Sequence, residues 1–597
     1  MILQKLTYPD GAEFNENMYV RCNHAHVALI GEEHQIVSSN YRGQIGFDTY
    51  FNSLSYKKWK KYTRLSRVKL SLEIKGKCRL VLIGLELHGD EINRTILGSI
   101  IVDFPERETV VVDYPEKLDS DTLCFSIFPL SDTLEIFDGA YISDAQEETL
   151  PEITLALAIC TYRREDYIAR NMQMLKKCVF DEPDALLHGH VRVLIADNGN
   201  TLDAAAFDSR YVRLVPNKNS GGSGGFSRAA IEIMEDKSFH ASHIILMDDD
   251  IEFHVDALER TYTFLRMLKP EYAISMIGGA MFRTDYRYIQ HAAGETQTVD
   301  GIIFNKVGYN MNKLLYVMRN EIEEPFNYLG WWLCCIPVQL FERAHFSLPL
   351  FVQFDDIEFS LRNRDVPKIT LNGICCWHIP FDKKRSGVKN YYTIRNRTIV
   401  NALCFDNYTK GRFIRDFSRT SIRCMFQYGY NEANLILLGA EDYLKGLSWL
   451  IEQDPVSLNT KVISLSDKLV DTDKLPIPFD IRTLQRNKDF GSVKRHVVRR
   501  FITVNGWLLP ANRTVTVEVD NPPIRYLYRA GTVLKYDVNS GKALVVERDY
   551  HQAFHILGRL MKLVLNTLKS FDRVRDENKK LYETVITKEF WKHFLNF

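Results

Sequence analysis

Three consecutive aspartates, Asp248, Asp249 and Asp250, follow the apolar run at residues 244–247. Because successive side chains of a strand point to opposite faces, Asp248 and Asp250 can act together while Asp249 faces away. Adjacent carboxylates repel one another, and a metal cation is the usual compensation. Two carboxylates on one side, near a phosphate, suit Mg²⁺ or Mn²⁺. The cluster therefore predicts a metal site, and the alternative is a solvated loop that caps the next helix.

A second acidic pair, Asp355 and Asp356, lies in the segment "FDDIEFSLR". Ile357 and Leu361 of this segment have the i, i+4 spacing of a helical face. We therefore expect a helix whose first turn carries both carboxylates, where the helix dipole favours negative charge. Capping of this helix is the structural explanation for at least one of the two.

A glycine-rich run, "NKNSGGSGGF", precedes a predicted helix at residues 226–236. Its glycines let the backbone approach a ligand closely, and the start of the helix can bind an anion. The run is neither a G-x-G-x-x-G dinucleotide fingerprint nor a P-loop, because no GK[ST] follows. It indicates a phosphate-binding turn, with a flexible loop as the alternative. The glycines are Gly221, Gly222, Gly224 and Gly225.

The elements that position these residues alternate between strands and helices over residues 151–400. This alternation predicts an α/β domain with a parallel sheet of nucleotide-binding type. In such sheets the ligand lies beyond the carboxyl ends of the strands. Three predicted strands, at residues 153–160, 191–197 and 243–248, end in polar runs. These runs, "TYRR", "DNGN" and "DDD", should therefore converge on one edge of the sheet.

Two further domains are predicted on either side of this sheet. Residues 1–150 contain short alternating or apolar segments separated by Pro, Asp and Gly, which is typical of an antiparallel β-sandwich. Its first two strands are predicted on either side of a turn around Gly76. Residues 401–597 are predicted to be mainly helical, with one helical face over residues 437–451 and a β-hairpin that turns at Gly541. A further helical face is predicted to combine Leu557, Leu560, Val564, Leu568 and Phe571.

The composition indicates a soluble globular protein of several domains. The chain has 597 residues, 45% of them hydrophobic, and Lys plus Arg equals Asp plus Glu at 76 each. This balance gives no support to a nucleic-acid partner. The eleven cysteines form no CxxC pair, which favours free thiols in a reducing cytoplasm. We find no signal peptide and no apolar run long enough for a membrane span, so we expect a cytoplasmic protein.

Seven motifs together carry a resemblance to a known family. They are "TYRR", "DNGN", "NKNSGGSGGF", "MDDD", "GWWLCCIP", "FDDIEFSLR" and "WHIPF", in this order over residues 153–400. The chain resembles the inverting nucleotide-sugar glycosyltransferases with a GT-A fold, and more narrowly the bacterial galactofuranosyltransferases that build cell-wall galactan. The segment "GFDTYFNSLSYKKWKKYT" is similar to the β-sandwich domain of that subgroup. The resemblance implies a Rossmann-like GT-A catalytic domain at residues 151–400, after a jelly-roll-like sandwich at 1–150 and before the helical domain at 401–597.

The resemblance also implies an activity, which is metal-dependent, inverting transfer of galactofuranose from UDP-galactofuranose. The acceptor would be a hydroxyl of a glycan or of a lipid-linked glycan. Arg164 and Asp197 would hold the uridine end of the donor, because a guanidinium offers a planar fork of donors and a carboxylate can accept from the uracil N–H. Gly222 and Asp249 would complete the nucleotide-sugar site.

The remaining roles follow from the same resemblance. His378 would join Asp248 and Asp250 as a third ligand of Mn²⁺ or Mg²⁺, since imidazole with carboxylates suits Mn²⁺; a packed core histidine is the alternative. Asp356 would be the general base that takes the proton from the acceptor hydroxyl, and Asp355 would help to orient the sugar.

Trp331 and Trp332 are the candidates for contact with the acceptor, because sugars pack their C–H faces on indole rings. Strand alternation predicts one ring toward the core and one toward the acceptor, and we favour Trp332 for the acceptor. A buried pair in the core is the alternative. His291 and Glu295 in "QHAAGE" are weaker acceptor-site candidates.

Several alternatives stay open. A transferase of the same fold could use UDP-glucose, UDP-galactopyranose or dTDP-rhamnose, and a non-catalytic carbohydrate-binding protein would explain the sandwich and the tryptophans. A dinucleotide-dependent oxidoreductase is disfavoured, because the first turn of the sheet lacks the glycine fingerprint. The basic run at residues 486–500 predicts peripheral association with the inner face of the cell membrane, or else is a solvated basic face. Assembly into a homo-oligomer is left open as well.

Overall fold

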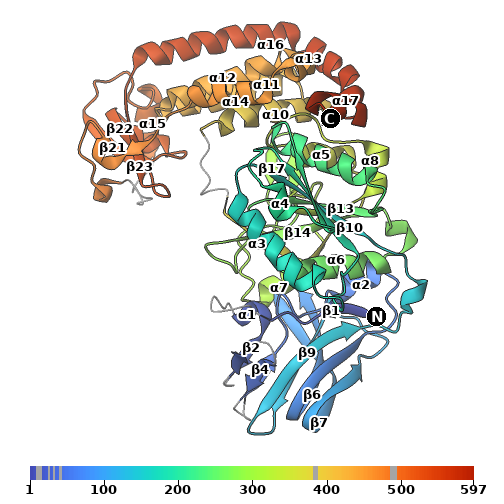
Figure 1. The fold of residues 1–597 in the computed structure, drawn as a ribbon. Helices are drawn as coiled ribbons and strands as arrows, with labels where there is room; N and C mark the ends of the chain where they lie inside the picture. Colours follow the sequence, from blue (N-terminus) through green and yellow to red (C-terminus); the bar gives the residue numbers. More distant parts are fainter. Residues whose placement is uncertain (9–15, 24–26, 31–33, 39–42, 381–386, 485–493) are drawn as a thin grey trace. The chain divides into compact units, whose positions relative to one another are not determined.

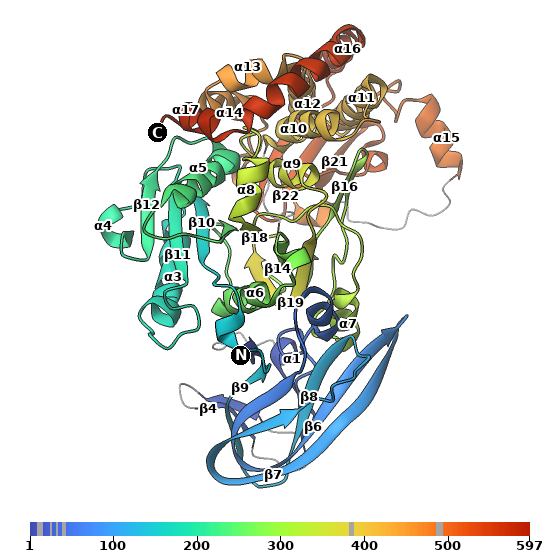
Figure 2. The ribbon, with the colours of Figure 1, turned by 90° about the vertical axis from the view of Figure 1, so that its right-hand side faces the viewer.

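The structure is a computed structural model that describes the chain except residues 9–15, 24–26, 31–33, 39–42, 381–386 and 485–493. Two compact units are present (Figures 1 and 2). The first comprises Met1–Ser347, Phe359–Pro380 and Trp591–Phe597, and the second comprises Leu348–Glu358 and Phe381–Phe590. Residues 1–150 and most of 151–400, which the sequence analysis separates, therefore share one unit.

The first unit begins with an antiparallel sheet of nine strands. Every pairing between its described strands is antiparallel, as predicted, but the strands form one hydrogen-bonded sheet and not two separate ones. Its main path runs β2-β5-β8-β6-β9-β4-β3, with β1 on β9 and β7 on β6. The strands are β1 (Ile2–Lys5), β2 (Arg21–Asn23), β3 (Val27–Ile30), β4 (His34–Ser38), β5 (Gln44–Gly46), β6 (Lys69–His88), β7 (Glu91–Asp113), β8 (Thr122–Pro129) and β9 (Leu134–Ile142).

The predicted turn around Gly76 is wrong, because β6 continues through it. The register of the strand shifts between Ile74 and Gly76, and Gly76 has a φ of 114°. A bulge at a glycine bends a strand without ending it. The bend lets β6 pair with β9 over its first part and with β8 over its second part. One long strand therefore replaces the two predicted short ones.

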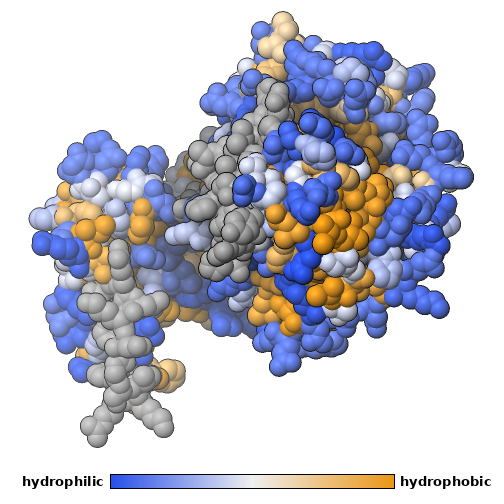
Figure 3. All heavy atoms as spheres, turned by 90° about the horizontal axis from the view of Figure 1, so that it is seen from below, coloured by the Kyte–Doolittle hydropathy of each residue, from blue (hydrophilic) through white to orange (hydrophobic). Residues whose placement is uncertain are grey.

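Strand β7 carries much of the exposed apolar surface of this sheet. Ile96, Ile101 and Val111 on it are 68%, 66% and 51% exposed. Seen from below, hydrophobic residues gather in a patch on the part of the molecule that holds the nine-stranded sheet (Figure 3). The pairing of β7 with β6 leaves its other edge without a strand among the described residues.

A second sheet of eight strands holds the three polar runs. Strands β10, β11 and β13 are parallel, as predicted, and β12, which was not predicted, pairs parallel with β11. Strand β18 joins the sheet antiparallel to β13. The register places Thr161 opposite Asp197 and Cys160 opposite Asp248, so the runs meet at one edge. The strands are β10 (Leu155–Thr161), β11 (Val191–Asp197), β12 (Val212–Pro216), β13 (His243–Asp248), β14 (Met276–Arg283), β15 (Gln290–Ala292), β18 (Leu333–Pro337) and β19 (Lys368–His378).

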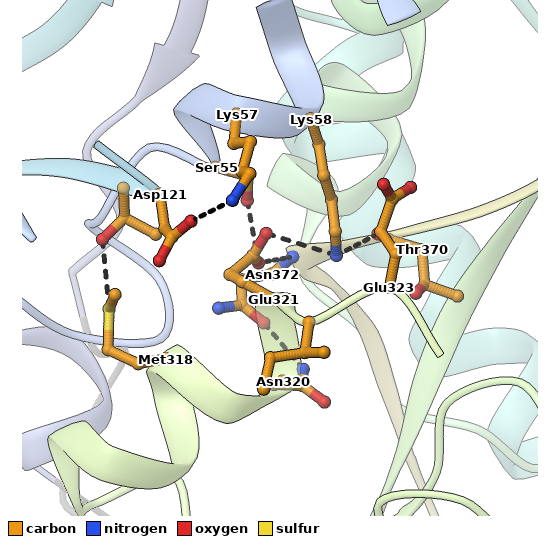
Figure 4. A network of polar contacts seen from close by, with 12 residues as sticks. Ser55, Lys57, Lys58, Asp121, Met318, Asn320, Glu321, Glu323, Thr370 and Asn372 are labelled. Carbon is orange, nitrogen blue, oxygen red and sulfur yellow. Dashed lines mark hydrogen bonds and ion pairs between the residues drawn. The ribbon is translucent and has the colours of Figure 1, made fainter. Parts of the chain in front are cut away.

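Buried polar contacts join the two sheets, which explains why they share one unit. Helix α2 (Tyr56–Tyr62) follows the nine-stranded sheet and carries Lys58. The Lys58 ammonium lies 3.2 Å from Glu321 Oε2 and donates to Thr370 O at 2.8 Å, while Ser55 Oγ donates to Glu321 Oε1 (Figure 4). On helix α6 (Val255–Met267), Arg260 donates to Phe51 O at 2.6 Å.

The second unit is mainly helical, as predicted. Its longer helices are α10 (Lys389–Cys404), α11 (Lys410–Phe426), α12 (Tyr430–Tyr443), α14 (Pro455–Ser464) and α16 (Tyr550–Val585). The hairpin of β22 (Ala530–Asp537) and β23 (Lys542–Glu547) is confirmed. The single helical face predicted over residues 437–451 is wrong, because Gly446 at a φ of 87° separates α12 from α13 (Gly446–Glu452). No helix in the described ranges is long and apolar enough to cross a membrane.

Candidate active site

The three predicted metal ligands lie together at the carboxyl edge of the eight-stranded sheet. Asp248, Asp250 and His378 each offer a ligand atom within 4.8 Å of the others. His378 Nε2 lies 3.1 Å from Asp250 Oδ1, and both side chains are buried. A pair of backbone hydrogen bonds between Glu252 and Trp377 brings the end of β19 beside the aspartates. Residues about 130 positions apart in the chain thus meet in one cluster.

The two carboxylates and the imidazole of this cluster fit a divalent cation. Two carboxylates and one imidazole match the preference of Mn²⁺, and the carboxylates also suit Mg²⁺. Asp250 is 4% exposed and has Asp248 beside it, so its charge needs compensation that water cannot supply. Arg164 gives part of it, with Nη2 lying 3.8 Å from Asp250 Oδ2. Arg164 is therefore placed next to the cluster.

Asp249 faces away from this cluster and ties two strand ends together. Its Oδ2 accepts hydrogen bonds from Thr161 Oγ1 at 2.8 Å and from the Tyr162 N–H at 3.2 Å. Burial, and after it the charge of Asp250, raise the pKa of the Asp249 carboxyl above its usual value. These contacts hold the end of β10 against the end of β13.

Asp197 organises the loop that follows β11. Its carboxylate accepts from the backbone N–H groups of Gly199, Thr201 and Leu202 at 2.8, 2.7 and 2.9 Å. The side chain is 2% exposed. Three backbone donors already occupy the two oxygens, so the local contribution of Asp197 is to fix the loop.

Asn198, the next residue, is one that the sequence analysis missed. Its Nδ2 donates to Gly221 O at 3.0 Å, and its Oδ1 accepts from Asn217 Nδ2 at 2.7 Å. It therefore connects the end of β11 to the start and to the middle of the glycine-rich run. The only signal in the sequence is its place in "DNGN", which does not reveal a partner about 20 residues away.

The four glycines of the glycine-rich run lie in a helix and not in a loop, whereas residues 217–220 precede this helix. Helix α5 spans Gly221–Glu235 and so begins five residues before the predicted start, with Gly222 in its first turn. A Cβ at Gly225 would collide with Cys160 Sγ, so a glycine here lets the helix pack directly on β10. This close packing offsets the low helix propensity of glycine.

Trp331 and Trp332 precede β18 and are both buried. Trp332 donates from Nε1 to Gly279 O at 2.8 Å and belongs to the main core of the first unit. Trp331 packs edge-on against Phe226, and its Nε1 has no acceptor among the described residues. The assignment of Trp332 to the acceptor therefore conflicts with its place in the core, and Trp331 holds the unpaired donor.

Asp355 and Asp356 open helix α9 (Asp355–Arg362), as the pattern predicts, and belong to the second unit. Asp356 Oδ1 accepts from the Ile357 N–H at 2.7 Å. The residues just before the helix, Gln353 and Phe354, have positive φ values of 63° and 71°. Non-glycine residues in this region are strained, and the surrounding structure must hold them there.

Helix α10 supplies the groups that hold this strained segment. Asn396 Nδ2 donates to the carbonyls of Val352 at 2.7 Å and Gln353 at 3.1 Å, and Arg395 Nη2 donates to Leu350 O at 2.9 Å. Both side chains are at most 1% exposed. The sequence analysis missed them, because they follow the acidic pair by about 40 residues and match no local pattern.

The two weaker acceptor-site candidates lie on the strand and turn after β14. His291 is half-buried in β15, and Glu295 is 1% exposed. The backbone of Glu295 exchanges hydrogen bonds with Tyr328, two residues before Gly330. This places Glu295 near the segment that carries Trp331.

Comparison with known families finds similarity at the N-terminal end. The family model "Galactofuranosyltransferase 2 N-terminal" matches residues 7–143. Among solved structures, a mannosyltransferase from Pyrobaculum calidifontis in complex with GDP-Man and Mn²⁺ is 11% identical. That match covers 54% of this chain and 86% of the other, with a TM-score of 0.29.

Two curated relatives are similar over a longer range. The galactofuranosyltransferase GlfT2 of Mycolicibacterium smegmatis is 25% identical over 433 residues, which cover 68% of this chain and 64% of the relative. GlfT2 of Mycobacterium tuberculosis is 28% identical over 396 residues, 61% of this chain and 59% of the relative. The chain thus spans about three fifths of the relatives that it matches. The resemblance to bacterial galactofuranosyltransferases predicted from the motifs is confirmed by these sequence similarities.

Proposed function

We propose that this protein is a metal-dependent, inverting glycosyltransferase with a GT-A catalytic domain, and that it moves galactofuranose from UDP-galactofuranose to a glycan hydroxyl. The observation that carries the proposal is the cluster of Asp248, Asp250 and His378 at the carboxyl edge of a parallel sheet. Ligands of open α/β sheets bind at this edge. The similarity to galactofuranosyltransferases supports the choice of donor sugar.

The donor site would be built from the strand ends that meet at this edge of the sheet. Asp248, Asp250 and His378 would hold Mn²⁺ or Mg²⁺, which neutralises the negative charge that develops on a departing diphosphate. Arg164, 44% exposed in its side chain, can turn from Asp250 toward the nucleotide. Asp197 and Asn198 would keep the loop after β11 in shape beside the uracil, with Gly222 at the start of α5 near the phosphates.

The acceptor side would use the acidic pair and a tryptophan. Asp356 takes the proton from the attacking hydroxyl, which enters from the face opposite to the leaving UDP and so inverts the anomeric centre. Asp355 orients the sugar. Trp331 replaces Trp332 as the tryptophan that contacts sugar, because its buried N–H has no partner in the described part of the chain. Its donor can be satisfied by a hydroxyl oxygen.

Release of the nucleotide from a panel of sugar donors tests this function. Purified protein is incubated with UDP-galactofuranose, UDP-galactopyranose, UDP-glucose or dTDP-rhamnose, with Mn²⁺ and a galactan-like acceptor. We expect release of UDP from UDP-galactofuranose that is faster than from the other donors and that stops in EDTA. A faster release from another donor would reassign the sugar. Binding of glycan without nucleotide release from any donor would show a carbohydrate-binding protein and refute the proposal.

We further propose that the second unit attaches the protein to an anionic membrane surface. Helix α16 has two apolar stripes, and the outer one is solvent-exposed, with Phe554 at 71%, Met561 at 63% and Leu565 at 52%. No acidic residue occurs from Tyr550 to Phe571, whereas Lys and Arg residues do. An exposed apolar stripe beside basic residues is typical of helices that lie in the lipid interface.

A second segment of this unit has the same character. Phe501, Ile502 and Leu508, in and after α15 (Lys494–Ile502), are 86%, 67% and 70% exposed. The segment is linked to the start of α16, because Tyr550 Oη donates to Trp507 O at 2.7 Å. The first part of the predicted basic run, residues 486–493, lies outside the described residues.

A further inference from the structure

A cavity that is separate from the metal cluster lies at the opposite end of β19. It has a volume of about 400 Å³ and is lined from α2, from the segment after α7 (Leu314–Glu321) and from the start of β19. Lys368 opens β19 and His378 closes it ten residues later. Strand β14 pairs with β19 from Met276 opposite Lys368 to Arg283 opposite His378, and seven steps of about 3.3 Å separate the two ends by roughly 23 Å. The cavity is therefore not part of the proposed donor site.

Basic side chains from three segments line this cavity. They are Lys58 and Lys61 of α2, Lys306, Arg364 and Lys368. The acidic residues of the lining are Glu323, Glu324 and Asp365, and Glu323 already pairs with Lys61 at 2.7 Å. The lining thus has two more basic than acidic groups.

Two of these lysines, the buried Lys306 and the half-buried Lys368, have no carboxylate partner in the described ranges. Lys306 is 8% exposed and donates only to the carbonyls of Asn320 and Ile322, each at 2.7 Å. Lys368 donates to the carbonyls of Asn363 and Val366 at 2.8 and 3.1 Å. Neither lies within 4 Å of a carboxylate of the described chain, in contrast to Lys58 beside Glu321. One N–H of each ammonium is left without an acceptor in the same ranges.

Burial has the expected electrostatic effect on both groups. It lowers the pKa of Lys306 to about 8, with the charge of Lys58 acting in the same direction and those of Glu321, Glu323 and Glu324 opposing it. It lowers the pKa of Lys368 to about 8 as well, where Asp365 and Cys334 oppose the effect and Arg364 adds to it. A bound anion would stabilise the charged form of a lysine whose pKa is lowered by burial.

Both lysines also donate hydrogen bonds to carbonyls at the ends of helices, which is a structural role. Lys306 contacts carbonyls at the end of α7, and Lys368 contacts carbonyls just after α9, where cations are favourable. This role accounts for two N–H groups of each lysine. It does not account for an open cavity on which both converge, nor for the left-handed backbone of Lys306, with a φ of 57°. Strain of this kind clusters at ligand sites.

We propose that this cavity binds a small phosphate-bearing anion through Lys306 and Lys368, with Lys61 and Arg364 at its rim. Lysine ammonium groups bind phosphate as point charges, and phosphate oxygens can accept from both lysines at once. Lys58 and Thr370 line one side of the cavity and belong to the network with Glu321, so the anion would brace the junction of the two sheets (Figure 4). The inference does not rest on the proposed transferase activity.

Calorimetric titration with inorganic pyrophosphate in EDTA tests the site without a metal ion. We expect one site in the wild-type protein, an affinity at least about tenfold weaker in Lys306→Met or Lys368→Met, and no binding in the double variant. Lys269→Met is the matched control, because its exposed ammonium also donates to two carbonyls, those of Lys60 and Lys61. Equal binding by the double variant and the wild type, or no heat with the wild type, would overturn the proposal.

The same titration at pH 8 in two buffers of different ionisation enthalpy gives a second readout. About half of each lysine is neutral at a pH equal to its pKa, so binding should take up about one proton for the two lysines together.

Titration with phosphate and with UMP then distinguishes two ligand classes. Equal affinities would show that the site recognises the phosphate group alone, and tighter binding of UMP would show that it recognises a nucleotide. If the variants do not fold, protection of Lys306 and Lys368 from acetylation by pyrophosphate, read by peptide mass spectrometry, replaces them. Absence of protection would refute the site.

Discussion

At the scale of residues, the site divides into groups that face a ligand and groups that hold the strand ends. Asp248, Asp250 and His378 converge, while Asp249 turns to Thr161 instead. The alternation of side chains in a strand predicts this division from the sequence, although β13 ends at Asp248 and a turn carries Asp249 and Asp250. His378 needed the family resemblance, because a lone histidine beside a tryptophan is more often only packed.

Asp356 is predicted to act in turnover and not in binding. Asp356→Asn keeps an oxygen that can accept from the Ile357 N–H, so the start of α9 should persist. The lost base should lower kcat by ~10² to 10⁴-fold while UDP affinity in Mn²⁺ stays the same. Asp355→Asn is the neighbouring control and should act mainly on KM. Steady-state kinetics with titration of UDP separates these effects, and equal kcat values for both variants would contradict the assignment.

Substitution of Trp332 is predicted to lower stability, whereas substitution of Trp331 is predicted to weaken acceptor binding. Trp332→Phe loses the hydrogen bond to Gly279 O and should lower the free energy of unfolding by ~1 to 2 kcal/mol. Trp331→Phe removes a donor without an acceptor among the described residues, so stability should change less while KM for the acceptor rises. Denaturant unfolding and acceptor titration measure both. A stability loss for Trp331→Phe as large as that for Trp332→Phe, with KM unchanged, would argue against a sugar contact.

At the scale of elements, local patterns predict most strands well and irregular backbone poorly. Strands β11 and β13 match their predicted ranges because buried apolar runs end in polar residues. The continuation of β6 through Gly76 and the early start of α5 were missed. Both depend on tertiary packing around a glycine, which no local pattern encodes. Arg395 and Asn396 were missed for the same reason, since their partners are distant in the chain.

The packing of α5 on β10 gives a direct test of this point. Gly225→Ala places a methyl group against Cys160 Sγ and should cost ~1 to 3 kcal/mol of stability, although alanine is the better helix former. Gly558→Ala is the control, because nothing lies within 4 Å of its Cβ position in α16, and it should stabilise slightly. Thermal unfolding reads both. Adding Cys160→Ala to Gly225→Ala should recover part of the loss; no loss in Gly225→Ala would mean that α5 is not packed in this way.

At the scale of the whole molecule, the chain separates into a unit that carries the metal cluster and a unit that carries exposed apolar helices. The sequence analysis identified the basic run but not the outer stripe of α16. It grouped Leu557 and Leu568 with buried Leu560 and Phe571, whereas the structure exposes the first two at 38% and 51%. A helix with two apolar stripes cannot be divided into faces by spacing alone.

Membrane attachment is predicted to depend on this outer stripe. Met561→Ser combined with Leu565→Ser should weaken binding to phosphatidylglycerol vesicles by roughly tenfold or more, because two apolar side chains no longer enter the interface. Ile463→Ser on α14, 49% exposed in the same unit, is the control and should bind normally. Co-sedimentation measures binding, which should also fall in high salt. Equal sedimentation of both variants would exclude α16 as the contact.

The decisive measurement is the metal dependence of galactofuranose transfer, which tests whether Asp248, Asp250 and His378 hold a catalytic cation. Transfer is measured against Mn²⁺ concentration after EDTA treatment in the wild type, in Asp250→Asn and in the exposed control Asp473→Asn. We expect no transfer in EDTA and full recovery with Mn²⁺ in the wild type and the control. We expect a rate at least about 100-fold lower in Asp250→Asn at the same Mn²⁺ concentration. Undiminished transfer in EDTA, or an Asp250→Asn variant as active as the wild type, would refute the proposed metal site.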